Sequence, residues 1–169
     1  TFIRSIPLIQ KKVKGCKIII VGEKKGVSYG ASCETGEWCE KFIAEIKGQY
    51  IEEDVHLIGS IDHESFTKLI QRSNIHVYLT YPFVLSWSLL EAMACEKPIV
   101  GSRTEPVMEL ISHNRNGLLV DFFDKEELSD SVAKLAKDTE LAQRLGKEAR
   151  KTIKERYELY ECVNKQINL

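Results

Sequence analysis

The chain has 169 residues, of which 43% are hydrophobic and 29% charged, a composition that fits one globular domain with a sizeable core. Its formal net charge of -1 provides no overall basic field, so we expect no nucleic-acid partner. No apolar run approaches the roughly 20 residues of a membrane-spanning helix. The five cysteines lack paired C-x-x-C spacing, which favours a reducing, cytoplasmic compartment. Only Cys33 and Cys39, six apart in a polar loop, offer a weak metal-ligand pair.

Helical and strand patterns alternate in the first half of the chain. Apolar residues at helical spacing and continuous β-branched runs predict elements at residues 2–13 (helix), 16–21 (strand), 38–46 (helix), 55–58 (strand), 63–71 (helix) and 75–79 (strand). Because the strands are continuous apolar runs, we expect them to be buried on both faces. The polar loop over residues 23–36 is longer than most connections, which indicates a binding or lid role.

The second half continues the same alternation. Its elements are predicted at residues 88–95 (helix), 98–102 (strand), 106–112 (helix), 118–120 (strand), 125–137 (helix) and 140–157 (helix). The segment from Glu158 onward is weakly specified, and the lysines and glutamates of residues 134–155 read as a solvated helix face. Alternating helices and apolar strands indicate an α/β fold with a mostly parallel sheet.

In a parallel α/β sheet, ligands bind beyond the carboxyl ends of the strands. The loops that begin at Gly22 and Gly59, and the segments 81–88 and 102–105, all follow predicted strands and therefore belong to that edge. Arg103 on this edge is expected either to meet a phosphate or to be a solvated surface residue. His63 is expected at the start of a helix, and the four histidines show no metal-ligand spacing.

Residues 80–95 form a strand end, a turn at Pro82 and a helix that is expected to open at about Ser88. Backbone N–H groups at such a helix start point at an anion, for example a diphosphate. The carboxylate of Glu91 could accept two hydrogen bonds from a vicinal diol such as a ribose, each contributing roughly 1.5–3 kcal/mol. Residues 88–91 also match a capping box, in which Glu91 folds back on the cap amide. Spacing alone favours this capping alternative.

A resemblance to a known family favours the nucleotide-binding role of Glu91 over the capping role. Residues 90–95 (Leu-Glu-Ala-Met-Ala-Cys) followed by Pro-Ile-Val at 98–100 resemble the signature of the retaining GT-B glycosyltransferases called group 1 or family 4. Further blocks of that family are matched at 19–22, 57–59, 105–109 and 116–120, which place Gly22 and Gly59 at nucleotide-contacting strands. The resemblance implies a Rossmann-like, doubly wound sheet with helices on both faces, and transfer of sugar from a nucleotide donor.

Carried over by position, the resemblance gives each part of the nucleotide a contact. Glu91 would bind the ribose hydroxyls, and the amides of Trp87 and Ser88 would hold the diphosphate. The backbone of Ile61 would meet the base. The resemblance implies no metal and no cofactor, since amides and basic side chains neutralise the diphosphate.

The sugar end of the site departs from the family. The amides of Leu85 and Ser86 would approach the donor sugar, and Glu109 would support the sugar or its loop, with a salt-bridge or helix-turn role equally open. Phe83 stands where the family usually has a glutamate, so we expect different sugar recognition. Glu96-Lys97 replaces the usual glycine after the helix, which we interpret as a surface change.

The family's diphosphate-gripping Arg and Lys and its acceptor-binding N-terminal domain have no counterpart in the sequence. Residues 1–169 are therefore expected to be the donor-binding half of a longer hexosyltransferase-type enzyme, inactive alone. The expected partners are the nucleotide-sugar donor and the N-terminal domain, with peripheral membrane contact through that domain. Surface polysaccharide or glycolipid synthesis is the expected role. The alternatives are a non-catalytic doubly wound interaction module and a degenerate glycosyltransferase scaffold.

Overall fold

The computed structural model describes residues 1–23, 33–34, 36–81 and 83–167. In chain order its elements are α1 (Phe2–Lys12), β1 (Ile18–Val21), α2 (Trp38–Glu45), the 3-10 helix η1 (Glu52–Asp54), β2 (Val55–Gly59), α3 (His63–Arg72), β3 (His76–Tyr78), α4 (Trp87–Ala94), β4 (Ile99–Ser102), α5 (Glu105–Leu110), β5 (Leu118–Val120), α6 (Lys125–Lys137), α7 (Thr139–Arg156) and α8 (Leu159–Ile167). Every predicted helix and strand is present, with ends within two residues of the prediction. The predicted loop at 23–36 lies largely outside the described residues.

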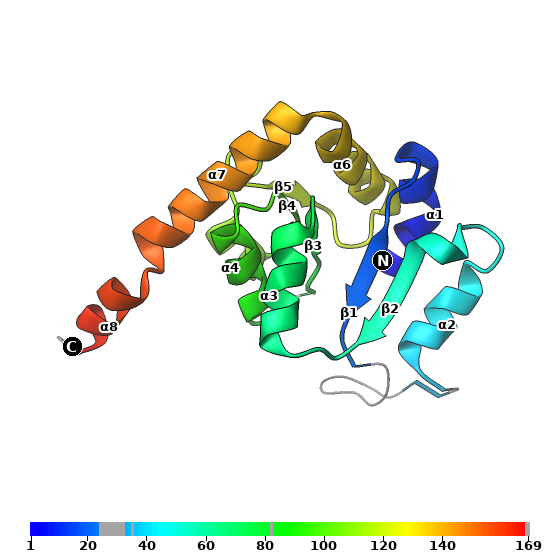
Figure 1. Ribbon diagram of the computed structural model, residues 1–169, viewed down its shortest axis with the longest axis horizontal. Helices are drawn as coiled ribbons and strands as arrows, with labels where there is room; N and C mark the ends of the chain where they lie inside the picture. Colours follow the sequence, from blue (N-terminus) through cyan, green and yellow to red (C-terminus); the bar gives the residue numbers. More distant parts are fainter. Residues whose placement is uncertain (24–32, 35, 82, 168–169) are drawn as a thin grey trace.

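All described strand pairs are parallel, which confirms the α/β class. β1 pairs with β2, with Ile18 opposite Val55, and β4 pairs with both β3 and β5 (Figure 1). Within the described residues no ladder joins β1 to β3, so the expected single sheet is divided into two ladders. Ile18 of the first ladder and Val100 of the second nevertheless belong to one hydrophobic core cluster. The carboxyl ends of the strands within each ladder therefore share an edge.

The two ladders differ in burial. Every residue of β4 and β5 is buried, as expected for strands covered on both faces. In the other ladder Ile18 packs with Ile6 and Ile9 of α1, whereas Ile19 is 42% exposed and Ile58 of β2 41% exposed. The expectation of burial on both faces is therefore wrong for β1 and β2. An apolar run records a strand's composition and does not say which elements cover its second face.

One face of helix α4 is buried in a second hydrophobic core cluster, which also contains Ile99 and Ala149. Leu89, Ala92 and Met93 are 0% exposed and pack with Ile99 of β4 and Ala149 of α7. Close approach to α7 depends on a glycine at position 146, because a Cβ there would lie 2.1 Å from the carbonyl oxygen of Glu96. Within the described ranges no helix is long and apolar enough to cross a bilayer.

The turn after α4 has a backbone requirement that the sequence reading missed. The Lys97 amide donates to the Ala92 carbonyl oxygen at 3.0 Å, and the Glu96 amide to that of Met93 at 3.1 Å, a Schellman-type ending. Glu96 has a φ of 58°, in the left-handed region where glycine is favoured. Glu96 is exposed, as a surface change would be, but its side chain also introduces backbone strain.

Replacing this residue with glycine tests the strain. We expect Glu96→Gly to raise the free energy of unfolding by about 0.5–1 kcal/mol, since strain relief outweighs the added freedom of the unfolded chain. The ion pair between Glu96 and Arg150, at 3.6 Å between half-exposed side chains, contributes little to the free energy of unfolding. Urea denaturation measures the change. Glu96→Gln, which removes the charge but keeps the Cβ, is the control and should leave stability nearly unchanged; equal stabilisation by both variants would contradict the backbone explanation.

A half-buried histidine in β3, His76, whose Nε2 atom is enclosed, should make stability depend on pH. Burial lowers the pKa of His76 from 6.5 to about 4, and its Nε2 has no hydrogen-bond partner within the described residues. The unfolded chain therefore binds a proton that the folded chain does not take up between pH 6.5 and 4. The contribution of neutral His76 to the free energy of unfolding is fully present above pH 6.5. It falls as the pH drops, and about 2 kcal/mol is lost at pH 5.

Urea denaturation at pH 7.5 and pH 5 checks this expectation. His76→Leu should lose that part of the pH dependence, whereas the exposed His56→Ala should keep it. An equal pH dependence in the wild type and His76→Leu would show that His76 is not the group responsible.

Candidate functional site

Gly22 and Gly59, which were each expected to follow a strand and to contact the nucleotide, meet at the carboxyl edge of the ladder formed by β1 and β2. The Gly22 amide donates to the Gly59 carbonyl oxygen at 3.0 Å. Gly59 has a φ of 72°, which turns the chain out of β2 towards Ile61 and α3. Ile61 is half-buried in that connection. The structure thus brings Gly22, Gly59 and Ile61 to one edge, as expected from their positions after strands.

A hydroxyl group fixes the exit of the chain from β3. Ser102, at the end of β4, is fully buried, and its Oγ accepts from the Thr80 amide at 3.0 Å and donates to the Thr80 carbonyl oxygen at 2.8 Å. Beyond it, the Ser86 amide donates to Tyr78 Oη at 2.8 Å. Both ends of the segment between β3 and α4 are therefore attached to strand residues, which sets the position of the helix start.

Helix α4 begins at Trp87, one residue earlier than expected, with Ser86 as its N-cap. Ser86 Oγ accepts from the Ser88 amide at 3.2 Å. A diphosphate at this helix start would have to replace the Ser86 hydroxyl to reach the Ser88 amide. The Trp87 side chain is 79% exposed and rests on the solvent side of the helix. The Ser86 amide, expected to approach the donor sugar, is engaged by Tyr78.

Glu91 is not part of a capping box. It is the fifth residue of α4, and its Oε1 lies 2.6 Å from Nε2 of His63, the first residue of α3. The capping alternative for residues 88–91 is therefore wrong, because the side chain of Ser86 takes the cap position. The Glu91 side chain is 30% exposed, so its carboxylate remains within reach of a ligand.

The remaining predicted residues lie in the loop before α4 and in α5. Phe83 is 48% exposed in the loop before α4, and Leu85 packs against the core beneath that helix. Glu109 lies in α5, where its carbonyl oxygen accepts from Arg156 Nη1 at 3.1 Å. Within the described residues no hydrogen bond or ion pair links Glu109 to Glu91.

Arg103 is engaged by the protein. Its Nη2 donates to Glu127 Oε1 at 2.8 Å and to the Leu119 carbonyl oxygen at 3.0 Å. The guanidinium thus ties the end of β4 to α6 rather than standing as an unpaired surface cation. For metals, no group of three or more His, Cys, Asp or Glu side chains in the described part of the chain is arranged to hold an ion.

Comparison with known proteins identifies the family of this chain. The family model for glycosyl transferases group 1 matches residues 1–152. The chain belongs to that family.

Curated relatives are glycosyltransferases of which this chain spans about a third. An uncharacterized glycosyltransferase of Methanocaldococcus jannaschii is 29% identical over 150 residues, 88% of this chain and 35% of the relative. The N-acetyl-alpha-D-glucosaminyl L-malate synthase of Bacillus anthracis is 30% identical over 119 residues, 70% of this chain and 31% of the enzyme.

Solved structures agree on the fold. The C-terminal domain of a group 1 glycosyl transferase from Francisella tularensis superposes with a TM-score of 0.80 at 19% identity, covering 94% of this chain and 78% of that domain. Anabaena HepE in complex with UDP-glucose matches with a TM-score of 0.78 at 21% identity, over 99% of this chain and 43% of HepE. The fold is therefore that of the C-terminal half of a GT-B glycosyltransferase.

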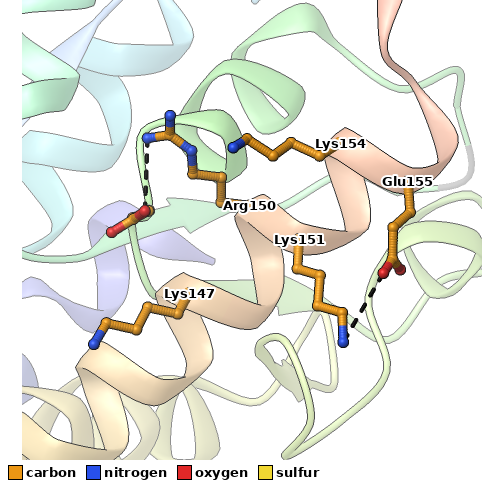
Figure 2. A pocket seen from close by; sticks show the side chains of 6 residues that line it. Lys147, Arg150, Lys151, Lys154 and Glu155 are labelled. Atoms are coloured by element: carbon orange, nitrogen blue, oxygen red, sulfur yellow. Dashed lines mark ion pairs between the residues drawn. The ribbon is translucent and has the colours of Figure 1, made fainter. Parts of the chain in front are cut away.

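One hollow among the described residues does not coincide with the group 1 signature. Figure 2 shows it on α7; it measures about 510 Å³ and is lined by Glu96, Lys147, Arg150, Lys151, Lys154 and Glu155. Glu96 follows the C-terminal end of α4, so this hollow lies at the opposite end of the helix from Trp87. Ion pairs of Arg150 with Glu96 and of Lys151 with Glu155 partly neutralise it, as expected for a solvated helix face.

Three features of the site were missed from the sequence. They are the contact of His63 with Glu91, the hydroxyl of Tyr78 at the Ser86 amide, and an aromatic cluster of Tyr81, Phe122 and Phe123 with ring centroids 5.0 to 5.4 Å apart. The cluster follows the carboxyl ends of β3 and β5. Two adjacent phenylalanines, one residue beyond the predicted strand at 118–120, are a signal that could have indicated it.

Removing one hydroxyl tests how firmly the helix start is held. Tyr78→Phe leaves the Ser86 amide without its acceptor, so we expect loss of about 1 kcal/mol of stability and a marked loss of hydrogen-exchange protection at that amide. Exchange followed by NMR measures the protection residue by residue. Tyr157→Phe, whose hydroxyl makes no hydrogen bond among the described residues, is the matched control; unchanged protection at Ser86 in the Tyr78 variant would contradict the assignment.

Proposed function

We propose that this chain is the donor-binding half of a retaining glycosyltransferase and holds a nucleoside-diphosphate sugar at the carboxyl edge of its strands. The observation that carries the proposal is the Glu91 carboxylate, which α4 presents beside the N-terminal end of the same helix. A carboxylate acceptor next to helix N–H groups suits a ligand with both a diol and a phosphate.

Each part of the donor has a proposed contact. Glu91 accepts hydrogen bonds from the ribose hydroxyls, the amides of Trp87 and Ser88 receive the diphosphate, and the backbone of Ile61 meets the base. The amides of Leu85 and Ser86 lie towards the sugar, the latter after release from Tyr78. Amides and basic side chains neutralise the diphosphate, so the proposal includes no metal ion.

The relatives suggest which donors to try first. HepE was crystallised with UDP-glucose, and the Bacillus anthracis and Staphylococcus aureus relatives are named as transferring N-acetylglucosaminyl groups. We therefore propose a UDP-hexose as donor. The Staphylococcus aureus relative acts on poly(ribitol-phosphate), and a Mycobacterium tuberculosis relative on a phosphatidylinositol mannoside. Surface polysaccharide or glycolipid synthesis in the cytoplasm is the proposed setting.

The remainder of the reaction is assigned to another domain. We propose that an N-terminal half of the same protein supplies the acceptor site, the cations that grip the diphosphate and any peripheral membrane contact. Residues 1–169 alone would then bind donor but transfer no sugar. The expected donor-binding unit covers this whole stretch.

A second candidate rests on Phe83. This side chain, 48% exposed, stands where the family usually has a glutamate that contacts the donor sugar. Loss of that carboxylate fits a degenerate scaffold that has kept the nucleotide end of the site and lost transfer. A scaffold of this kind would bind UDP and UDP-glucose equally well, because the sugar would add no contact.

Nucleotide titration tests the ribose role. Glu91→Ala should lower UDP affinity at least tenfold, because it removes two charge-assisted hydrogen bonds of roughly 1.5–3 kcal/mol each. Isothermal titration calorimetry with UDP, UDP-glucose, UDP-N-acetylglucosamine, GDP and ADP measures the affinities. Glu140→Ala, an exposed glutamate on α7, is the matched control and should bind like the wild type. Undiminished binding by a folded Glu91→Ala variant would refute the role.

A further inference from the structure

We infer that His63 is a positioning residue that holds the Glu91 carboxylate in the orientation that accepts the ribose hydroxyls. The inference rests on the proposed function and concerns the same site. It starts from the 2.6 Å contact between His63 Nε2 and Glu91 Oε1, which joins two helices across 28 positions of sequence. No feature of the sequence motifs around Glu91 assigns a role to a residue of α3.

The proton of this contact can be assigned. An ionised carboxylate is acceptor-only, so the Nε2 of His63 is the donor. In the neutral ring Nδ1 then carries no proton and is an acceptor.

The start of α3 holds His63 in place. Asp62 caps the helix: its Oδ1 accepts from the Ser65 amide at 2.9 Å and its Oδ2 from Ser65 Oγ at 2.7 Å. These hydrogen bonds lower the pKa of the Asp62 carboxyl, so the cap stays ionised at neutral pH. Thr67 Oγ1 donates to the His63 carbonyl oxygen at 2.9 Å. The first residue of α3 is thus fixed by local bonds on both sides.

Core packing fixes α3 against α4. Ile70 of α3 and Leu89 of α4 are buried in one cluster, and Phe66 packs against it. Ile70 and Leu89 cannot move apart without exposing apolar surface, so the distance between His63 and Glu91 is set by the core. The contact is therefore a consequence of how the two helices pack and does not depend on a ligand.

The geometry favours positioning over blocking. A carboxylate offers about four lone-pair sites, and His63 uses one of them on Oε1. Three sites remain, which is enough for the two hydroxyls of a ribose. With one oxygen held, the carboxylate loses rotational freedom before the ligand arrives, which reduces the entropy lost on binding. His63 follows Ile61 by two residues in the chain and contacts Glu91, so it connects the residues proposed for base and ribose.

This arrangement predicts a selective effect on ribose. The wild-type chain should bind UDP at least tenfold more tightly than 2′-deoxy-UDP, because the deoxy ligand lacks one hydroxyl for Glu91. His63→Ala should weaken UDP binding about three- to tenfold and change 2′-deoxy-UDP binding much less. His63→Gln, whose amide N–H can still donate, should retain most of the preference. In the Glu91→Ala background, His63→Ala should have no further effect.

Calorimetric titrations of these variants with UDP and 2′-deoxy-UDP, or the GDP and ADP pairs if those bind better, supply the measurements. His56→Ala is the matched control, an exposed histidine on β2. Circular dichroism checks that each variant is folded. A wild-type chain with no preference for the ribose form overturns the ribose role of Glu91 and this inference with it.

If the wild type discriminates, an unchanged preference in His63→Ala overturns the positioning role alone. Tighter UDP binding by His63→Ala would identify His63 as a competitor of the ribose and would equally overturn it. A further loss from His63→Ala in the Glu91→Ala background would show that His63 acts independently of the carboxylate, which also contradicts the inference.

Discussion

The burial of one face of α4 is the constraint from which the candidate site follows. Leu89, Ala92 and Met93 are wholly excluded from solvent between β4 and α7, and each large side chain contributes roughly 1.5–3 kcal/mol by that burial. Rotation of the helix would expose them. With this face fixed inward, Glu91 must lie on the side of the helix that meets α3, and the N-terminal end must lie at the strand edge. The functional orientation of α4 is therefore a result of core packing.

Much of the fold could be predicted because its signals are local and repeated. The pattern of residues 125–137 gave α6 with its observed ends, since apolar residues recur at helical spacing and Asp124 caps the helix. α8 escaped prediction because Leu159, Tyr160 and Ile167 are exposed, so no buried face organises its pattern. The exposure of one face of the ladder formed by β1 and β2 also could not be predicted. Which elements cover a strand depends on the arrangement of the whole chain.

The candidate site was predictable in location and only partly in detail. The strand edge, Gly22, Gly59 and the place of Glu91 follow from parallel topology and from a family signature. The capping box, which was the alternative that spacing alone favoured, is wrong. The spacing of Ser88 and Glu91 fits a capping box, but the N-cap of α4 is Ser86. The contacts of Glu91 with His63 and of Ser86 with Tyr78 join separate elements. They depend on how helices and strands pack, and this packing cannot be predicted from a short stretch of sequence.

The division of the strands into two ladders has a thermodynamic consequence for the proposed donor. Gly22 and Gly59 belong to one ladder and α4 packs on the other, so a nucleotide contacting both would add a second connection between two ladders that are joined through the core cluster of Ile18 and Val100. A ligand that binds only when both are closed stabilises each of them, by about 2.7 kcal/mol at a concentration 100 times its Kd. Donor binding would thereby make the unfolding of the two ladders more cooperative.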